Sequence, residues 1–475
     1  MNDTSPNHVE IKQLFVGTHT KAGNNIILDG INLAIPRGKT LALVGESGSG
    51  KSLTALSIAQ LLPAKLAYGT KSQIHLDSLS ILDLPEVVMQ QIRGKRIGFI
   101  FQEPMTALNP VLTVEQQLRE SMTWHGIISK KRFAHSSRKK QLQQTLISLL
   151  DAVGIEDSVR CLQCYPHQLS GGMKQRVMIA MALAAEPEIL IADEPTTAVD
   201  VSIQAQILAL LNHIKNTRQL SMLFITHDLG VVKKIADYIA VMYAGQIVEY
   251  AEVEAFFAAP QHPYSRQLIA AIPSYEKRNH LLPVTIVKNE DVQQLGCKFA
   301  NRCPWVMPIC QQTMPELLPR HEGHEVRCYL TEQKPMPVQS ISVDNAFSIK
   351  HEQISLLSVQ QLSVYFPIKK GIFKRTVDVV KAVENVSFEL YQGETLAVVG
   401  ESGSGKTTLA KAIIGLLAPT SGNIVYQQHD ATDENSHTDI AQMIFQDPYS
   451  SLNPKMMVAD LVAEGLRAKG QRIKD

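Results

Sequence analysis

One seven-residue sequence, Gly-Glu-Ser-Gly-Ser-Gly-Lys, occurs twice in this chain, at residues 45–51 and 400–406. Ser52 follows the first copy and Thr407 the second, so both complete the pattern G-x-x-x-x-G-K-[ST]. In this pattern, backbone N–H groups of a glycine-rich turn surround nucleotide phosphates at a helix N-terminus. The lysine reaches the β- and γ-phosphates, and the Ser/Thr hydroxyl is a ligand for Mg²⁺. The repeat therefore predicts two nucleotide-binding domains in tandem.

The residues around each copy predict a strand, a glycine-rich loop and a helix, in that order. Residues 41–44 and 396–399 are short apolar runs, typical of buried parallel strands, and residues 53–62 and 408–417 are predicted helices. The repeat extends further, because the sequence at residues 101–110 recurs with few changes at residues 445–454. We therefore expect an α/β fold of the P-loop NTPase class, duplicated as a whole domain.

The predicted phosphate-binding residues follow directly from the pattern. In the first copy they are Gly45, Glu46, Ser47, Gly48, Ser49, Gly50, Lys51 and Ser52. In the second copy they are Gly400, Gly403, Gly405, Lys406 and Thr407. A glutamine follows the next apolar strand in both copies, as Gln102 and Gln446, where its side chain could contact Mg²⁺ and the attacking water. A surface glutamine is the alternative, but its identical place in both copies favours a contact with the nucleotide site.

Length and composition limit what else the chain can be. Its 475 residues suffice for two or three domains, and its 46 basic and 45 acidic residues balance, which argues against nucleic acid as a partner. No apolar run is long enough for a membrane-spanning helix, and the polar first ten residues do not form a secretory signal. We expect a cytosolic protein whose six cysteines are thiols or metal ligands.

Two further predicted strands end in groups suited to phosphate chemistry. Residues 189–194 are an apolar run that ends in Asp193 and Glu194, and residues 222–226 are a second run, followed by His227. Two carboxylates at a strand end cost free energy unless a cation or hydrogen bonds compensate them. Asp193 is thus suited to hold Mg²⁺, Glu194 to polarise the attacking water, and His227 to contact the γ-phosphate. A solvated strand end and a structural histidine are the alternatives.

Between these features lies the sequence Leu-Ser-Gly-Gly-Met-Lys-Gln at residues 169–175, which opens a helix predicted at residues 173–185. Small residues before a helix leave free N–H groups at the positive end of the helix dipole, which attracts anions. A glycine-containing helix cap without a ligand is equally compatible with the residues taken alone.

The order of these motifs resembles that of the ATPase subunits of ATP-binding-cassette (ABC) transporters, over residues 11–258. The resemblance implies a RecA-like core with a helical subdomain, with ATP and Mg²⁺ as ligands. It implies that Glu194 is the catalytic carboxylate, assisted by His227 and Gln102, and that Ser52, Gln102 and Asp193 surround Mg²⁺. It further implies a head-to-tail pair of ATPase domains, in which the signature of one domain completes the nucleotide site of the other. The signature residues concerned are Ser170, Gly171, Gly172 and Gln175.

The same resemblance bears on partners and on the adenine. Residues 103–167 look like the helical subdomain that touches a membrane permease, which implies a peripheral position on the inner face of the membrane. The family usually stacks adenine on an aromatic residue upstream of the phosphate loop. Aligning Leu14 with Leu362 puts Phe366 at that place in the second copy but Thr18 in the first.

Four of the six cysteines lie between the two copies, at Cys297, Cys303, Cys310 and Cys328. Four thiolates around Zn²⁺ or an iron–sulfur cluster fit this grouping, as do four small buried apolar residues, and the spacing does not decide among them. His262-Pro-Tyr264, with the later Gly296-Cys297, resembles the C-terminal element of dipeptide and oligopeptide importer ATPases. That resemblance implies a [4Fe–4S] cluster. Cys161 and Cys164 have no partner pair nearby and are interpreted as a coincidence.

The second copy has no counterpart to the signature, the Asp-Glu strand or the histidine, because Leu169 lies farther from Lys51 than Asp475 lies from Lys406. We divide the chain into a complete ATPase domain at residues 1–258, a Cys-rich element with a linker at 259–350, and a truncated second domain at 351–475. The sequence predicts marginal stability for that last part. A truncated or frameshifted product is the favoured interpretation, and a homodimer of two complete first domains is the alternative.

Together these features predict an ATPase that energises import of peptides or a related small solute through a membrane permease. A periplasmic or surface solute-binding protein would act with the permease and touch this chain only indirectly. A soluble tandem ABC ATPase of the ribosome or DNA-repair class is the rival, as is an inactive remnant. ABC ATPases that act on ribosomes typically join their domains by a charged helical linker, and those of the DNA-repair class carry strongly basic patches. Neither feature stands out in this sequence.

Overall fold

The computed structural model describes residues 6–20, 23–124, 136–197, 199–272, 295–321, 323–330, 355–370, 375–401, 403–426, 441–445 and 451–468. The chain forms two compact units, Met1–Asp344 and Asn345–Asp475. The predicted linker at residues 331–350 and the predicted site residue Gln446 lie outside the described residues.

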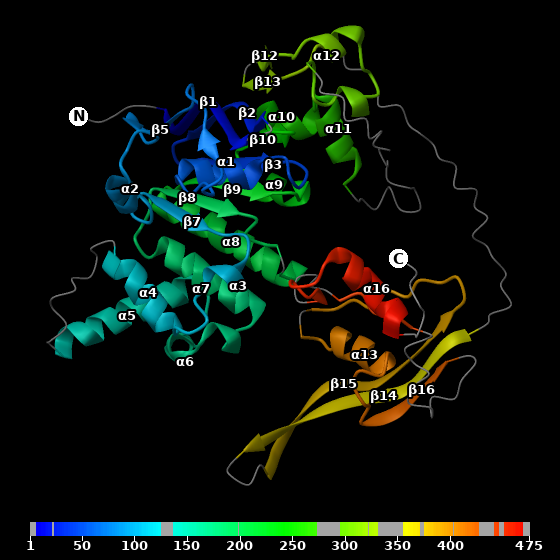
Figure 1. Cartoon of the computed structure of the whole chain (residues 1–475). Helices are drawn as coiled ribbons and strands as arrows, with labels where there is room; N and C mark the ends of the chain where they lie inside the picture. Colours follow the sequence, from blue (N-terminus) through cyan, green and yellow to red (C-terminus); the bar gives the residue numbers. More distant parts are fainter. Residues whose placement is uncertain are drawn as a thin grey trace. The chain divides into compact units, whose positions relative to one another are not determined.

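The centre of the first unit is an eight-stranded sheet (Figure 1). Its strands, in spatial order, are β12 (Leu318–His321), β13 (His324–Val326), β11 (Gln246–Glu252), β10 (Tyr238–Tyr243), β3 (Thr40–Val44), β9 (Ser221–Thr226), β8 (Ile189–Asp193) and β7 (Ile97–Ile100). From β10 to β7, neighbouring strands are parallel. Parallel strands are covered on both faces, and every residue of β3, β8 and β9 is buried. The strands predicted at residues 41–44, 189–194 and 222–226 are confirmed, and β7 is the apolar strand predicted before Gln102.

Helices pack on this central sheet. Helix α1 (Lys51–Ile58) contacts β8 and β9, and α9 (Leu229–Ile235) contacts β3 and β9. Helix α8 (Val201–Arg218) buries Ile207 and Leu211 in one hydrophobic cluster with residues of β8 and β9, and α2 (Glu86–Ile92) buries Met89 in a second cluster, with α1. The helix predicted at residues 53–62 ends earlier than expected, because Gln60 has a φ of 50°, outside the helical region.

A smaller, antiparallel sheet shares a hydrophobic core with the central sheet. Its strands are β1 (Asn7–Thr20), β2 (Gly23–Pro36), β4 (Ala67–Tyr68), β5 (Gln73–Leu76) and β6 (Leu79–Ser80). Val9, Ile11 and Leu14 of β1 are buried in one cluster with Leu41 and Leu43 of β3. This shared core holds the start of the phosphate loop, which follows β3, against the antiparallel sheet.

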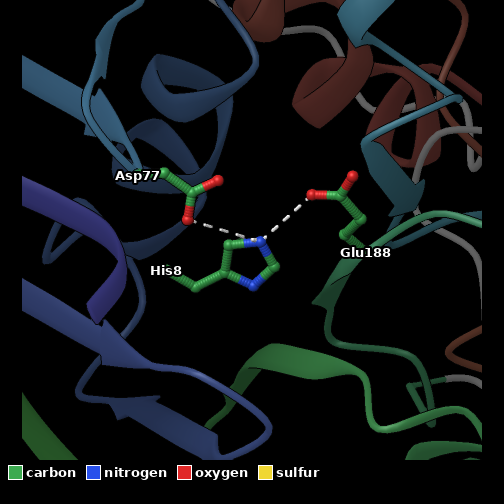
Figure 2. Close-up of side chains that lie close together, drawn as sticks. All are labelled: His8, Asp77 and Glu188. Carbon is green, nitrogen blue, oxygen red and sulfur yellow. Dashed lines mark hydrogen bonds and ion pairs between the residues drawn. The ribbon is translucent and has the colours of Figure 1, made fainter. Parts of the chain in front are cut away.

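An ion-pair cluster also ties the two sheets together (Figure 2). His8 Nε2 of β1 lies 3.3 Å from Glu188 Oε2 and 3.9 Å from Asp77 Oδ1. Such a trio could surround a cation, but Arg96 pairs with Asp77 at 2.6 Å and with Glu188 at 2.7 Å, and Arg37 also pairs with Asp77. The two arginines already balance the carboxylates, and burial lowers the pKa of His8, which favours a neutral ring. We therefore interpret the cluster as a structural cross-link.

Helices gather beside β7 in a subdomain of their own (Figure 1). They are α3 (Pro104–Ala107), α4 (Val114–Trp124), α5 (Ser136–Ala152), α6 (Ser158–Gln163) and α7 (Gly171–Leu183), with the 3-10 turn η1 (Pro166–Gln168) before α7. Helix α7 contacts α3, α4, α5 and β7. It begins two residues before the predicted start, because the Ser170 hydroxyl accepts a hydrogen bond from the Met173 N–H at 3.3 Å.

The Cys-rich element packs within the first unit rather than apart from it. Besides β12 and β13 it contains α11 (Pro263–Ala270), η3 (Ala300–Arg302) and α12 (Pro308–Gln312), and α10 (Val253–Ala258) leads into it. Strand β13 pairs antiparallel with β11, so the element lengthens the central sheet. Tyr264 and Phe299 share a buried core with Val44 and Val241 of the parallel strands. The element is thus attached by both hydrogen bonds and apolar packing.

The second unit has a three-stranded antiparallel sheet of β15 (Arg375–Tyr391), β14 (Ser355–Lys370) and β16 (Ser421–Tyr426), in that order. Helix α13 (Lys406–Ile413) packs on β14 and β15, and α16 (Val458–Ala468) follows later in the chain. A small core includes Leu357, Leu362 and Leu409. The helix predicted at residues 408–417 is present with shifted ends.

The buried strand predicted at residues 396–399 is wrong. These residues form no strand, and Leu396, Val398 and Val399 are 46%, 49% and 87% exposed. Their counterpart β3 is buried because β10 and β9 flank it, and no described strand of the second unit occupies either of those places. An apolar segment becomes a buried strand only where neighbours cover it and pair with it. Helix α16 likewise has no buried residue. Both observations support the predicted marginal stability, which stays a prediction.

Candidate functional site

The carboxyl ends of four parallel strands bring the predicted site residues together at one edge of the central sheet. Strand β3 leads into the phosphate loop, and β9 leads into His227. Strand β8 ends in Asp193 and leads into Glu194, and β7 leads towards Gln102. Because parallel strands end at the same edge, groups far apart in sequence meet there.

The phosphate loop, residues 45–52, has the geometry of an anion cradle. The Lys51 ammonium donates hydrogen bonds to the carbonyl oxygens of Gly45 and Glu46, at 2.8 and 2.9 Å. A Cβ at Gly45 would lie 2.2 Å from the Met242 carbonyl oxygen, so glycine is required there. Burial lowers the pKa of Lys51, and the Ser49 hydroxyl is buried without a hydrogen-bond partner among the described residues. Both groups would gain a partner from a bound phosphate.

A cation site adjoins the loop. Ser52 Oγ donates a hydrogen bond to Asp193 Oδ1 at 3.1 Å, so a hydroxyl and a carboxylate face each other across the start of α1. Burial raises the pKa of Asp193, and the neighbouring Glu194 raises it further, while the Ser52 hydrogen bond opposes the rise. A divalent cation between these oxygens would compensate the buried negative charge. The pair therefore fits Mg²⁺, which prefers oxygen ligands.

Glu194 is the point where three other side chains converge. Its Oε2 accepts hydrogen bonds from Gln102 Nε2 at 3.2 Å and from Thr197 Oγ1 at 2.8 Å, and it lies 3.5 Å from His227 Nδ1. Glu194 has a φ of 45°, uncommon for a residue other than glycine, and its N–H donates to the Ile225 carbonyl oxygen at 3.0 Å. The strand thus ends before Glu194, and the carboxylate of Glu194 lies beside the side chains of Gln102, Thr197 and His227.

Thr197 belongs to the site although no sequence motif predicted it. Nothing in its spacing marks it as functional, since one hydroxyl in a loop is common. It lies three residues after Glu194, and its N–H also donates to the Glu194 carbonyl oxygen at 3.1 Å. A turn that folds back onto a strand-end carboxylate is the only local signal that could have indicated it. His227, by contrast, was predicted, and its side chain is 63% exposed and so accessible to a ligand.

The signature at residues 169–175 takes no part in the hydrogen bonds of the site just described. Ser170 and Gly171 are exposed, and their helix α7 packs on the helical subdomain and β7, whereas α1 packs on β8 and β9. Gln175 is fully buried and its Nε2 donates to the Pro195 carbonyl oxygen at 2.6 Å. Ser170 and the two glycines after it are thus free to face a ligand, while Gln175 links α7 to the residue that follows Glu194.

The four cysteines of the Cys-rich element line one small cavity, together with His262, Phe299 and Trp305. Burial raises the pKa of Cys303 to about 12 and also raises those of Cys297 and Cys328, and the nearby cysteines add to each rise. Backbone N–H groups point at these sulfurs, such as that of Leu330 at 3.4 Å from Cys328 Sγ. Four sulfurs with N–H donors around them fit a metal centre that would stabilise the thiolate form. Gly296 packs against the Cys310 carbonyl oxygen, where a Cβ would lie 2.2 Å away.

Known families and relatives match most of the chain. A family described as "ABC transporter" matches residues 28–197 and 383–475, and one described as "Oligopeptide/dipeptide transporter, C-terminal region" matches residues 248–310. The chain is 39% identical to the peptidoglycan transport ATP-binding protein YejF of Agrobacterium fabrum over 464 residues. This aligned region is 97% of this chain and 70% of that protein. The chain belongs to the ABC transporter ATP-binding proteins of the oligopeptide importer type.

A second relative agrees with this family assignment. The glutathione import ATP-binding protein GsiA of Escherichia coli is 40% identical over 451 residues, which are 93% of this chain and 64% of that protein. The chain thus spans about two thirds of the length of these relatives. A dimeric bacterial ABC transporter cassette of known structure is 27% identical and covers 52% of this chain, with a TM-score of 0.45.

This ABC protein repeats part of its phosphate site in the second unit. Lys406 Nζ donates to the carbonyl oxygens of Gly400 and Glu401, at 2.8 and 2.6 Å, as Lys51 does in the first unit. Thr407 is exposed, and no described carboxylate of the second unit is hydrogen-bonded to it. The loop sequence alone is therefore sufficient for the lysine contacts, whereas the cation site also requires a carboxylate from β8. No described helix of the chain is long and apolar enough to cross a membrane.

Proposed function

We propose that this chain is the ATP-binding and ATP-hydrolysing subunit that energises import of peptides or a related small solute through a membrane permease. The observation that carries the proposal is the convergence of a phosphate loop, a cation site and a hydrogen-bonded carboxylate at one sheet edge. Its support comes from the family assignment and from relatives that are named as import or transport ATP-binding proteins.

Each part of the site has its own task in this proposal. The phosphate loop and Lys51 hold the β- and γ-phosphates, and Ser52 and Asp193 hold Mg²⁺, which neutralises charge that develops on the phosphates. Glu194 accepts a proton from the attacking water, while Gln102 and Thr197 fix the direction of its carboxylate. His227 is placed to donate a hydrogen bond to the γ-phosphate.

The signature would complete a site on another ATPase domain. Its exposed Ser170 and Gly171, with Gly172, lie at the N-terminus of α7, where free N–H groups favour an anion. Since α7 lies apart from α1 in the same domain, the anion it meets belongs to a facing domain. We infer a head-to-tail arrangement, with the chain held peripherally at the inner face of the membrane by the permease.

Assembly with the permease tests this proposal. Val111, between α3 and α4 of the helical subdomain, is 74% exposed, and Val87 of α2 is 70% exposed outside that subdomain. A charge at an apolar contact weakens association, so we expect Val111→Glu to reduce the amount of permease that co-purifies from detergent extracts, and Val87→Glu to leave it unchanged. The measurement is mass spectrometry of the tagged chain and its partners. Recovery of ribosomes or DNA in place of permease subunits would refute the importer assignment.

We further infer that the four cysteines hold an iron–sulfur cluster, with Zn²⁺ as the alternative. Removing Cys310, which is buried in the cavity wall, should abolish the site, because a cluster of this kind needs four thiolates. We expect protein purified without oxygen to contain iron and to absorb broadly in the visible blue, and Cys310→Ser to lose both. Cys164→Ser, in the helical subdomain, is the matched control and should keep them. Zinc in place of iron, or no metal, would contradict the cluster.

A further inference from the structure

Among the described residues, the hydrogen bonds between the Cys-rich element and the phosphate loop all meet Glu46, at its backbone and at its side chain. The Glu46 backbone N–H donates a hydrogen bond to Tyr264 Oη at 2.9 Å. The Glu46 carboxylate accepts two hydrogen bonds from the Arg302 guanidinium, both at 2.8 Å. The Glu46 carbonyl oxygen in turn accepts from Lys51, the residue that reaches the phosphates. Tyr264 and Arg302 therefore hold the same residue that holds Lys51.

Tyr264 is fixed before it meets the loop. It is buried, with its ring centroid 4.8 Å from that of Tyr243 and 5.5 Å from that of Phe299. Its N–H donates to His262 Nδ1 at 3.1 Å, and the His262 N–H donates to the fully buried Glu249 at 2.7 Å. Glu249 also lies 2.8 Å from His324 Nε2 of β13. These ring contacts and hydrogen bonds therefore fix the position of the Tyr264 hydroxyl.

Arg302 is fixed by the fold around the cysteines. It is the last residue of η3 and directly precedes Cys303. The turn is closed by hydrogen bonds from the Cys303 N–H to the Ala300 carbonyl oxygen at 3.2 Å and from the Ala300 N–H to that of Cys297 at 3.0 Å. The guanidinium lies over the rings of Tyr243 and Phe299, at 5.6 and 5.8 Å. A change in how Cys297 and Cys303 are held would therefore move Arg302.

The second phosphate loop shows what the loop does without this support. It has the same sequence, and Lys406 still bonds to the Glu401 carbonyl oxygen. Among the described residues, however, no side chain pairs with the Glu401 carboxylate or accepts from its N–H, and Glu401 is exposed. The lysine contact is intrinsic to the loop, whereas the two contacts on Glu46 are added by the Cys-rich element.

We propose that the Cys-rich element is a clamp on the first phosphate loop, in which Tyr264 and Arg302 are positioning residues that set the affinity for nucleotide. Since Arg302 is anchored next to Cys303, the state of the four-cysteine site is transmitted to the nucleotide through this clamp. The inference rests on the nucleotide binding proposed above. It gives the Cys-rich element a role in tuning the ATP site, beyond that of a structural extension.

The clamp is tested by nucleotide affinity, with Lys406→Met as background so that only the first loop is measured. The probe is AMP-PNP with Mg²⁺, followed by calorimetry. We expect Tyr264→Phe, which keeps the ring but removes one hydrogen bond, to weaken binding about fivefold. Arg302→Gln, which breaks a half-exposed ion pair, should weaken it about tenfold. Lys298→Gln is the matched control, because Lys298 joins the element to the core at Asp29 and Ala244 without touching the loop. It should leave affinity unchanged.

Three further results separate the clamp from a general loss of structure. Without nucleotide, the melting temperature of Tyr264→Phe should match that of the background. The double variant Glu46→Gln, Arg302→Gln should lose no more affinity for AMP-PNP than either single variant, because both substitutions break the same contact. Coupling is reciprocal, so in protein stripped of metal the nucleotide should slow the alkylation of the four cysteines by iodoacetamide in the background but not in Arg302→Gln. Unchanged affinity in Tyr264→Phe and Arg302→Gln would overturn the clamp alone, and a background chain that binds no AMP-PNP would overturn the proposed function with it.

Discussion

Replacement of Glu194 by glutamine should lower the rate of ATP hydrolysis by at least about a hundredfold, because it removes the group that takes a proton from the attacking water. Glutamine has the same shape, so the hydrogen bond that Thr197 donates to Glu194 Oε2 can persist to the amide oxygen of the glutamine, and the phosphate loop is untouched. Binding of ATP should therefore be retained. The measurement is steady-state phosphate release beside the dissociation constant for ATP, in assembled ATPase domains.

A carboxylate outside the site provides the control. Glu186 is exposed in the turn before β8, and Glu186→Gln should leave both quantities unchanged. The two variants remove the same charge within a few residues of one another, so a difference between them reflects the position of Glu194. Undiminished phosphate release in Glu194→Gln would rule out the role assigned to Glu194. Loss of ATP binding would show that Glu194 contributes to binding ATP and not only to the hydrolysis step.

Replacement of Lys51 by methionine should weaken nucleotide binding about a hundredfold, because a buried cation that meets the phosphates is removed without a substitute. The side chain is buried and bonded to two loop carbonyls, so methionine can fill the same space. Lys406→Met should weaken nucleotide binding much less. Its loop follows an exposed apolar segment, and its lysine is more exposed than Lys51.

Titration with a fluorescent ATP analogue and Mg²⁺ distinguishes the two loops in one chain. Lys71→Met, on the surface beyond the loop, is the control for a changed charge. If Lys406→Met weakened binding as strongly as Lys51→Met, the two loops would be equivalent in this chain. The difference in burial between Val44 and Val399, which directly precede the two loops, would then have no functional consequence.

The site around Glu194 could be predicted because each of its main groups follows a strand that is apolar throughout. Asp193 and His227 need only a strand-end position in the sequence to be placed at the correct edge. The same rule failed at residues 396–399, since burial depends on neighbouring strands and not on the apolar run itself. A local pattern of apolar residues does not tell whether strands from distant parts of the chain will flank the segment.

The contacts of Glu46 could not be predicted for a related reason. Tyr264 is 218 residues from Glu46 in sequence and Arg302 is 256 residues away. The resemblance to importer ATPases marked the His-Pro-Tyr sequence and the cysteines as features of a family, but it assigned no contact to them. The antiparallel pairing of β13 with β11, and the packing of Tyr264 and Phe299 against the parallel strands, bring this part of the chain beside the phosphate loop.

That pairing also determines where the first ATPase domain can be cut. Strand β11 would become the last strand of the sheet if the chain were shortened to residue 258, and its outer row of N–H and carbonyl groups would be left without partners. An edge of this kind recruits other chains into intermolecular sheets. A soluble fragment for crystallisation or inhibitor screening should therefore continue through β12 and β13 to residue 330, although the recognisable ATPase motifs end long before it.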